Sequence, residues 1–268
     1  MLGDNFFSLE SGESSIDGVR TGWITVKSPS LKSRADISAI IPEKAEDLGP
    51  LPVYIFLHGI YGSHWAWIIK GNLHKTSSAM IEDGLIKPAI ILMPSDGLWG
   101  DGSGYVDHGY QDFESWIVKD ITSAFQQAWP SIDISGPRFI AGLSMGGFGA
   151  LYLGSKYHDN FRGISAHSSV THLEQLESRI ERPFPESMDL HSPNYSAIHW
   201  IEAHKKTLPN LRFDCGIEDE LLMHNRELHD KLISLGISHS FQEFPGDHSW
   251  PYWEIHARES LTFFSNCN

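Results

Sequence analysis

The sequence predicts an α/β fold: a mostly parallel sheet of eight strands with helices on both of its faces. Three observations support this prediction. Short apolar segments alternate with helix-like segments along most of the 268 residues. The segment 53–57 (VYIFL) is apolar at every position, which is typical of a strand covered on both faces. At 142–146 (GLSMG), a serine between glycines joins an apolar segment to a helix-like one, as at a sharp strand-to-helix turn.

The expected strands are short and are separated by turn residues. Two of them, within 21–41, form an antiparallel hairpin across a Ser-Pro-Ser turn. Six more alternate with helices, as in a doubly wound sheet. These six strands are 52–57, 89–93, 138–141, 163–166, 211–215 and 240–244.

The best-supported helix is 110–129, because Trp116, Ile121 and Phe125 recur on one side at helical spacing and Pro130 ends it. The other expected helices are 147–156, 196–206, 220–235 and 250–264. No linker interrupts this pattern, so we expect one domain over residues 1–268. Two segments outside the alternation, 96–109 and 171–195, are expected to shape a pocket at the carboxyl ends of the strands.

Composition limits the possible partners. The chain has 34 acidic and 20 basic residues, a net charge of −14, which disfavours binding to nucleic acid or to an anionic membrane surface. No apolar stretch approaches the roughly 20 residues of a membrane span. Residues 1–10 lack the pattern of a secretory signal, so a cytoplasmic location is expected. Cys215 and Cys267 are too distant to suggest a disulfide framework or a metal site.

The serine of the 142–146 segment has the features of a nucleophile elbow. In such a turn the serine adopts a strained backbone conformation, and the residues two before and two after it must lack side chains so that strand and helix can approach. Gly142 and Gly146 meet this requirement. The following helix directs its unpaired N–H groups and positive dipole end towards the space above the serine oxygen. The sequence therefore predicts that Ser144 is a nucleophile in acyl transfer.

A serine hydroxyl needs a base, and the base needs a carboxylate to orient it. Among the 15 histidines, His248 stands out because it lies in a loop directly after the last expected strand. His224, His229 and His256 lie within expected helices, where surface or core positions account for them. His248 is therefore the predicted base.

The orienting acid is expected after the strand 211–215, where three carboxylates follow one another. We select Asp219, because Glu218 and Glu220 point elsewhere in a short turn. Glu218 remains the alternative, since either Asp or Glu can fill this role.

Stabilising the oxyanion of an acyl-transfer intermediate takes two backbone N–H donors. Met145, directly after the serine, supplies one. Ile60 supplies the other from the loop after the strand 52–57, where Gly59 lets the chain turn. His58, at the end of that strand, suits a structural hydrogen bond better than a catalytic role.

Four aromatic residues lie in loops near the expected mouth of the pocket: Trp65, Trp67, Trp99 and Tyr105. They are expected to line an apolar acyl or aryl pocket, with ordinary packing of the loops as the equal alternative. The sequence contains no metal-binding H-E-x-x-H pattern, so neither a metal nor another cofactor is predicted.

These motifs resemble those of the esterase family that includes esterase D (S-formylglutathione hydrolase), tributyrin esterases, feruloyl esterases and the antigen 85 mycolyltransferases. The resemblance runs from about residue 53 to the end. It rests on the segments 57–60 (LHGI), 142–147 (GLSMGG), 215–219 (CGIED) and 246–253 (GDHSWPYW). It implies an α/β-hydrolase fold, a triad of Ser144, Asp219 and His248, and oxyanion donors at Ile60 and Met145.

The expected function is hydrolysis of a small acyl or aryl ester by a serine esterase, through an acyl-enzyme intermediate. The alternatives are a thioester hydrolase of the S-formylglutathione type, an acyltransferase, and an inactive α/β-hydrolase domain that only binds a ligand. The Thr-Cys pair of esterase D is absent from 61–65 (YGSHW), which weakens the formylglutathione alternative. The predicted partner is a small-molecule ester, and the sequence leaves a homo-oligomer open.

Overall fold

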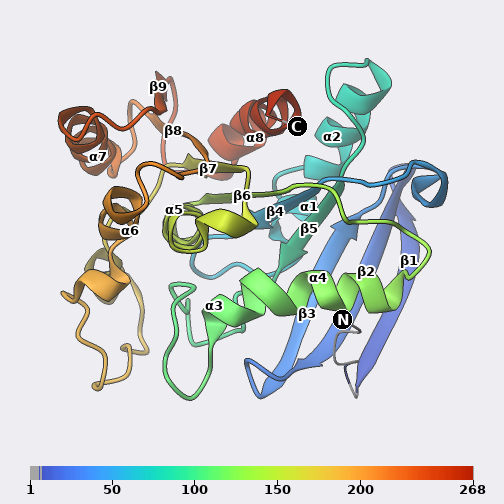
Figure 1. The fold of residues 1–268 in the computed structure, drawn as a ribbon, viewed down its shortest axis with the longest axis horizontal. Coiled ribbons are helices and arrows are strands. Elements are labelled where there is room, and N and C mark those ends of the chain that lie inside the picture. The colour runs from blue at the N-terminus through green and yellow to red at the C-terminus, as the bar shows by residue number, and fades with distance from the viewer. Residues whose placement is uncertain (1–5, 7, 268) are drawn as a thin grey trace.

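The computed structural model describes residue 6 and residues 8–267. Figure 1 shows a central twisted sheet with helices packed against its two faces. Residues 1–5 and 7, on which part of the expectation of a cytoplasmic location rests, lie outside the described residues.

One sheet runs through the described residues, with the strand order β1-β2-β3-β5-β4-β6-β7-β8-β9. The first three strands are antiparallel, and β3 pairs antiparallel with β5. From β5 to β9 all neighbouring strands are parallel. The strands are β1 (Leu9–Ile16), β2 (Val19–Ser28), β3 (Ser33–Ile40), β4 (Val53–Leu57), β5 (Ile90–Pro94), β6 (Arg138–Leu143), β7 (Gly163–His167), β8 (Asn210–Gly216) and β9 (Ser240–Phe244).

The mostly parallel sheet with helices on both faces is confirmed, but the expected number of strands was wrong. The sheet has nine strands instead of eight, because β1 precedes the expected hairpin and pairs with β2 along its whole length. The hairpin within 21–41 is therefore part of a three-stranded antiparallel unit. Six of the eight residues of β1 are exposed, so this edge strand lacks the apolar alternation that would reveal it.

Helices cover both faces of the sheet and bury two separate apolar cores. The alternation of β4 shows the division: Ile55 and Leu57 pack into one core, and Tyr54 and Phe56 into the other. The first core is covered by α3 (Phe113–Ser115), α4 (Ile121–Ala128), α5 (Met145–Lys156), α6 (Ala197–Ala203) and α7 (Leu222–Ser234). The second is covered by α1 (Ala66–Ile69), α2 (Leu73–Glu82) and α8 (Trp250–Asn266).

Two helical regions differ from the expectation. The helices α1 and α2 lie between β4 and β5, where the sequence predicted none. The helix expected over 110–129 begins only at Phe113 and contains a π-helical turn at Trp116–Asp120. Within that turn, the buried Asp120 carboxylate accepts a hydrogen bond of 2.5 Å from the Ser28 hydroxyl, which ties the helix to the end of β2.

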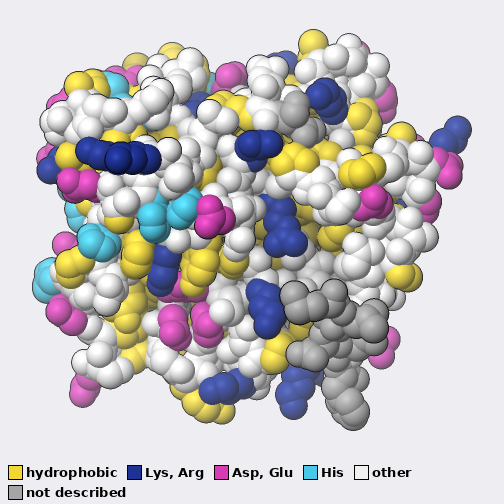
Figure 2. Space-filling view, viewed as in Figure 1, with side chains coloured by type: hydrophobic (Ala, Val, Ile, Leu, Met, Phe, Trp, Pro, Cys, Tyr) yellow, Lys and Arg dark blue, Asp and Glu magenta, His cyan; other side chains and the backbone are white. Residues whose placement is uncertain are grey.

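The parallel strands all end at the same edge of the sheet, so the segments that follow β4, β6, β8 and β9 meet there. None of the described helices is both long and apolar enough to cross a membrane. Figure 2 shows the face of the molecule that is visible in Figure 1. Lys and Arg side chains are scattered over it among neutral and acidic ones.

Candidate active site

Ser144 lies at the sharp turn between β6 and α5. Its φ and ψ are 55° and −118°, a conformation that non-glycine residues rarely adopt. A Cβ atom on Gly142 would lie 2.1 Å from the carbonyl oxygen of Gly146. One on Gly146 would lie 2.5 Å from the carbonyl oxygen of Leu57 at the end of β4. Both positions therefore need glycine for the strand, the helix and the neighbouring strand to come this close.

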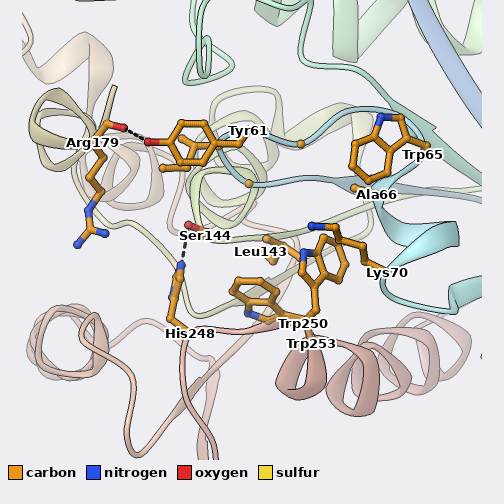
Figure 3. Close-up of a pocket in the computed structure, with 13 residues that line it drawn as sticks. Tyr61, Trp65, Ala66, Lys70, Leu143, Ser144, Arg179, His248, Trp250 and Trp253 are labelled. Atoms are coloured by element: carbon orange, nitrogen blue, oxygen red, sulfur yellow. Dashed lines mark hydrogen bonds between the residues drawn. The ribbon is translucent and has the colours of Figure 1, made fainter. Parts of the chain in front are cut away.

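The imidazole of His248 reaches Ser144 although the two residues are 104 positions apart in the chain. Its Nε2 lies 3.0 Å from the serine Oγ. The dashed line between the two residues in Figure 3 marks this contact. His248 lies in the loop between β9 and α8. The ring of Trp253, in the first turn of α8, packs edge-on against the imidazole with centroids 4.9 Å apart. This contact restricts the plane in which the imidazole lies.

Asp219 lies on the far side of the imidazole, in the turn after β8. Its Oδ2 lies 2.9 Å from His248 Nδ1, and its side chain is fully buried. Burial acts to raise the pKa of this carboxyl group. The hydrogen bonds with His248 and with the Leu221 amide outweigh burial and lower the pKa below its ordinary value. An ionised Asp219 favours the tautomer with the proton on Nδ1, which leaves the Nε2 lone pair facing Ser144.

The two carboxylates beside Asp219 have other partners. Glu218, the alternative acid, accepts a hydrogen bond of 2.6 Å from the amide of Gly246, and the Glu218 amide donates to the Gly246 carbonyl oxygen. Glu220 forms an ion pair of 2.6 Å with Arg179. Glu218 thus fastens the loop that carries His248, whereas Asp219 contacts the imidazole itself.

Two backbone amides lie near the serine with their hydrogen-bonding capacity unused. Among residue 6 and residues 8–267, neither the Ile60 N–H nor the Met145 N–H has a hydrogen-bond acceptor. Met145 begins α5, and Ile60 lines the pocket that contains Ser144. A Cβ atom on Gly59 would lie 3.2 Å from the Cβ of Ser144, so the loop after β4 passes directly beside the serine. His58 is buried, and its Nε2 accepts from the Asp96 amide, consistent with a structural role.

Ser144 opens into a pocket of about 350 Å³ whose walls include several aromatic side chains. Of the four expected aromatic residues, Trp65 lines this pocket and the other three do not. Trp67 and Tyr105 are fully buried, and each donates a hydrogen bond of 3.0 Å to a carbonyl oxygen at the end of β4. Trp99 stacks under the guanidinium group of Arg182, 3.3 Å from its ring centroid. A buried indole or phenol needs a polar partner, and the backbone supplies it for Trp67 and Tyr105.

Sequence reasoning missed seven side chains that line the pocket: Tyr61, Ala66, Lys70, Leu143, Arg179, Trp250 and Trp253. The two tryptophans follow the predicted base within five positions, so the start of the last helix could have indicated them. Arg179 comes from the segment 171–195, which was expected to shape the pocket without any one residue being named. Lys70 follows the unexpected helix α1, and nothing in the sequence points to it.

A buried charged cluster lies behind the site, between β7, β8 and α8. Asp214 Oδ2 lies 2.6 Å from Arg212 Nη2 and 2.8 Å from His167 Nδ1. The Tyr252 hydroxyl donates to Asp214 Oδ1 over 2.7 Å. The carbonyl oxygen of His167 in turn accepts the amide of Ser144 at 3.0 Å. The cluster thus ties the serine turn and the start of α8 to the same two strands.

Comparisons with known proteins identify the family of this chain. The sequence model of the family described as "Putative esterase" matches residues 28–261. The chain belongs to this esterase family. An acetyl esterase of Caldicellulosiruptor saccharolyticus is 25% identical to this esterase over 268 residues, which is 90% of this chain and 97% of the relative.

Solved structures show the same fold. A ferulic acid esterase superposes with a TM-score of 0.78 at 22% identity, covering 98% of this chain and 99% of the other. An S-formylglutathione hydrolase of Staphylococcus aureus superposes with a TM-score of 0.74 at 19% identity, covering 96% of this chain and 100% of the other. The α/β-hydrolase fold and the family resemblance are confirmed. The protein is therefore an esterase, an enzyme that hydrolyses carboxylic esters.

Proposed function

We infer that Ser144, His248 and Asp219 are the catalytic triad of this esterase and that it acts on an ester with a small acyl or aryl group. The observation that carries this proposal is the continuous chain of contacts from the Asp219 carboxylate through the imidazole to the serine oxygen, at 2.9 and 3.0 Å. These distances allow the imidazole to remove the serine proton without a rearrangement of the loop.

In the first half of the reaction, His248 Nε2 takes the proton of the Ser144 hydroxyl as the oxygen attacks the ester carbonyl carbon. The amides of Ile60 and Met145 then donate hydrogen bonds to the oxyanion. The positive end of the α5 helix dipole stabilises the same negative charge. The imidazolium returns the proton to the departing alcohol, which leaves an acyl group on the serine oxygen. Asp219 stabilises the imidazolium and does not itself take the proton.

In the second half, a water molecule replaces the alcohol. His248 removes a proton from the water as its oxygen attacks the acyl carbon, and the same proton returns to Ser144 when the carboxylic acid leaves. The similarity to an acetyl esterase over 97% of that relative supports a short acyl group. Trp65, Trp250 and Trp253 in the pocket are equally suited to an aryl group.

The experiment is hydrolysis of 4-nitrophenyl acetate by the wild type and by Ser144→Ala, His248→Gln and Ser78→Ala. We expect the first two variants to lose at least about 10⁴-fold in kcat, because the members of a triad act as a unit. Ser78 is a partly exposed serine of α2 that does not line this pocket, so its variant should keep the wild-type rate. Wild-type activity in Ser144→Ala would overturn the proposal.

A substrate series then defines the acyl group. We expect kcat/KM to be highest for acetyl, propionyl or feruloyl esters and to fall for long acyl chains, which exceed a pocket of about 350 Å³. A thioester included in the series tests the thioester-hydrolase alternative, and a second alcohol added as acceptor tests the acyltransferase alternative. Faster turnover of the thioester, or transfer to the alcohol in preference to water, would replace the proposed ester hydrolysis.

A further inference from the structure

The walls of the pocket carry positive charge in a protein that is strongly acidic overall. Lys70 and Arg179 are the charged basic side chains that line it, and none of its described lining residues is Asp or Glu. The whole chain, in contrast, has 34 acidic and 20 basic residues. The local charge at the site is therefore opposite in sign to the net charge of −14.

Of these two cations, Arg179 is already neutralised. Its Nη1 lies 2.6 Å from Glu220 Oε1, and this ion pair raises the pKa of the guanidinium group further above its ordinary range. The Arg179 carbonyl oxygen also accepts the hydroxyl of Tyr61 at 2.5 Å, which holds this side of the pocket in place. Arg179 therefore forms part of the pocket wall, and the Glu220 carboxylate balances its charge.

Lys70 has no such partner among the described residues. Within the described part of the chain, no carboxylate oxygen lies within 4.0 Å of its amine. The amine lies 6.0 Å from the ring centroid of Trp65, on the same wall of the pocket. Figure 3 shows the Lys70 side chain running past Trp250 with its amine turned towards Leu143 and the middle of the pocket. The ammonium group of Lys70 thus lies without a carboxylate partner among the described residues, at the end of the pocket where Trp65 and Trp250 lie.

This combination of groups fits a particular kind of substrate. Indole rings bind an apolar or aromatic body, and an ammonium group beside them binds a carboxylate at the end of that body. A net charge of −14 repels anions at long range, so selection of an anionic ester requires a local cation. We propose that Lys70 makes the site selective for esters that carry a carboxylate on the arm lying along Trp65 and Trp250. The inference rests on the proposed function of Ser144 as the nucleophile of the same pocket.

The experiment uses two matched pairs of esters, one for each arm. The first pair is mono-4-nitrophenyl glutarate and its neutral methyl ester, with the charge on the acyl arm. The second is 3-acetoxybenzoate and its neutral methyl ester, with the charge on the leaving group. Each ester is assayed with the wild type, with Lys70→Met, Lys70→Glu and Lys70→Arg, and with Lys206→Met as a control outside the pocket.

For at least one pair, we expect the wild type to prefer the anion by about three- to tenfold in kcat/KM, since a partly exposed ion pair contributes only a modest free energy. Lys70→Arg should keep the preference, Lys70→Met should remove it and Lys70→Glu should reverse it. Lys206→Met should match the wild type. Because Lys70 is exposed at the end of a short helix, these variants should fold, and their circular dichroism spectra check this.

The outcomes separate the two proposals. Hydrolysis of the neutral esters with equal anion-to-neutral ratios in the wild type and Lys70→Met would overturn the role of Lys70 and leave the nucleophile assignment intact. A preference that persists unchanged in Lys70→Glu would also overturn it. If the folded wild type hydrolyses none of the four esters, the proposed function itself fails, and the selectivity proposal fails with it.

Discussion

His248 Nδ1 lies 2.9 Å from the Asp219 carboxylate, while the adjacent Glu218 carboxylate binds the amide of Gly246. Two neighbouring acids therefore have different tasks: one orients the imidazole, and the other holds the loop that carries it. This division can be tested with isosteric substitutions at both positions.

Asp219→Asn should lower kcat by about 10⁴-fold, because an amide in place of the carboxylate favours the wrong imidazole tautomer. Glu218→Gln should cause a much smaller loss, since its side-chain oxygen can still accept from the Gly246 amide. The measurement is steady-state hydrolysis of 4-nitrophenyl acetate by both variants. A larger loss in Glu218→Gln than in Asp219→Asn would show that Glu218 is the orienting acid.

Gly146→Ala should destabilise the protein by at least about 2 kcal/mol, since the added Cβ would meet rigid backbone and not a movable side chain. The backbone atoms in question are the carbonyl oxygens of Leu57 and His58, each 2.5 Å from the ideal Cβ position. Gly12→Ala is the matched control, because a Cβ there has no neighbour within 4 Å. Urea unfolding of both variants measures the difference, and equal midpoints would contradict the close approach at the elbow.

Asp214→Asn should lower the free energy of unfolding at pH 7 by about 3 to 5 kcal/mol, because it leaves the buried Arg212 guanidinium without its charge partner. The double variant Arg212→Met/Asp214→Asn should be less destabilised than the sum of the two single variants. Thermal and urea unfolding measure these differences. Additive losses would show that the two groups do not interact.

The same carboxylate predicts a dependence of stability on pH. Burial acts to raise the pKa of Asp214, but His167 and Arg212 outweigh it and the pKa is lowered. A group with a lowered pKa in the folded state stabilises the protein above its ordinary pKa of about 4, and this stabilisation is lost as the pH falls further. The difference in unfolding free energy between the wild type and Asp214→Asn should therefore shrink between pH 5 and 3. A constant difference over this range would contradict the assignment.

The sequence predicted best the parts of the site that local sterics determine. The turn at Ser144 needs glycine two positions before and after the serine, and such a requirement is visible in the chain itself. The inner parallel strands could be placed because they are apolar at nearly every position, and His248 because its loop directly follows the last expected strand. The local structure at these positions therefore depends little on tertiary contacts with distant parts of the chain.

The parts that the sequence did not predict depend on tertiary packing. The polar edge strand β1 has no buried face, and α2 carries few apolar residues to mark its side against the sheet. Trp65 and Trp67 are two positions apart and chemically identical, yet one lines the pocket and the other is buried against β4. Only the arrangement of α1 decides between them.

The central claim is that Ser144 is an activated nucleophile, and covalent labelling tests it most directly. The wild type would be treated with a fluorophosphonate probe, digested and examined by mass spectrometry, beside Ser144→Ala and Ser78→Ala. The account predicts one adduct, on the peptide that contains Ser144, in the wild type and in Ser78→Ala but not in Ser144→Ala. A folded wild-type protein that stays unlabelled, or an adduct on another serine, would contradict it.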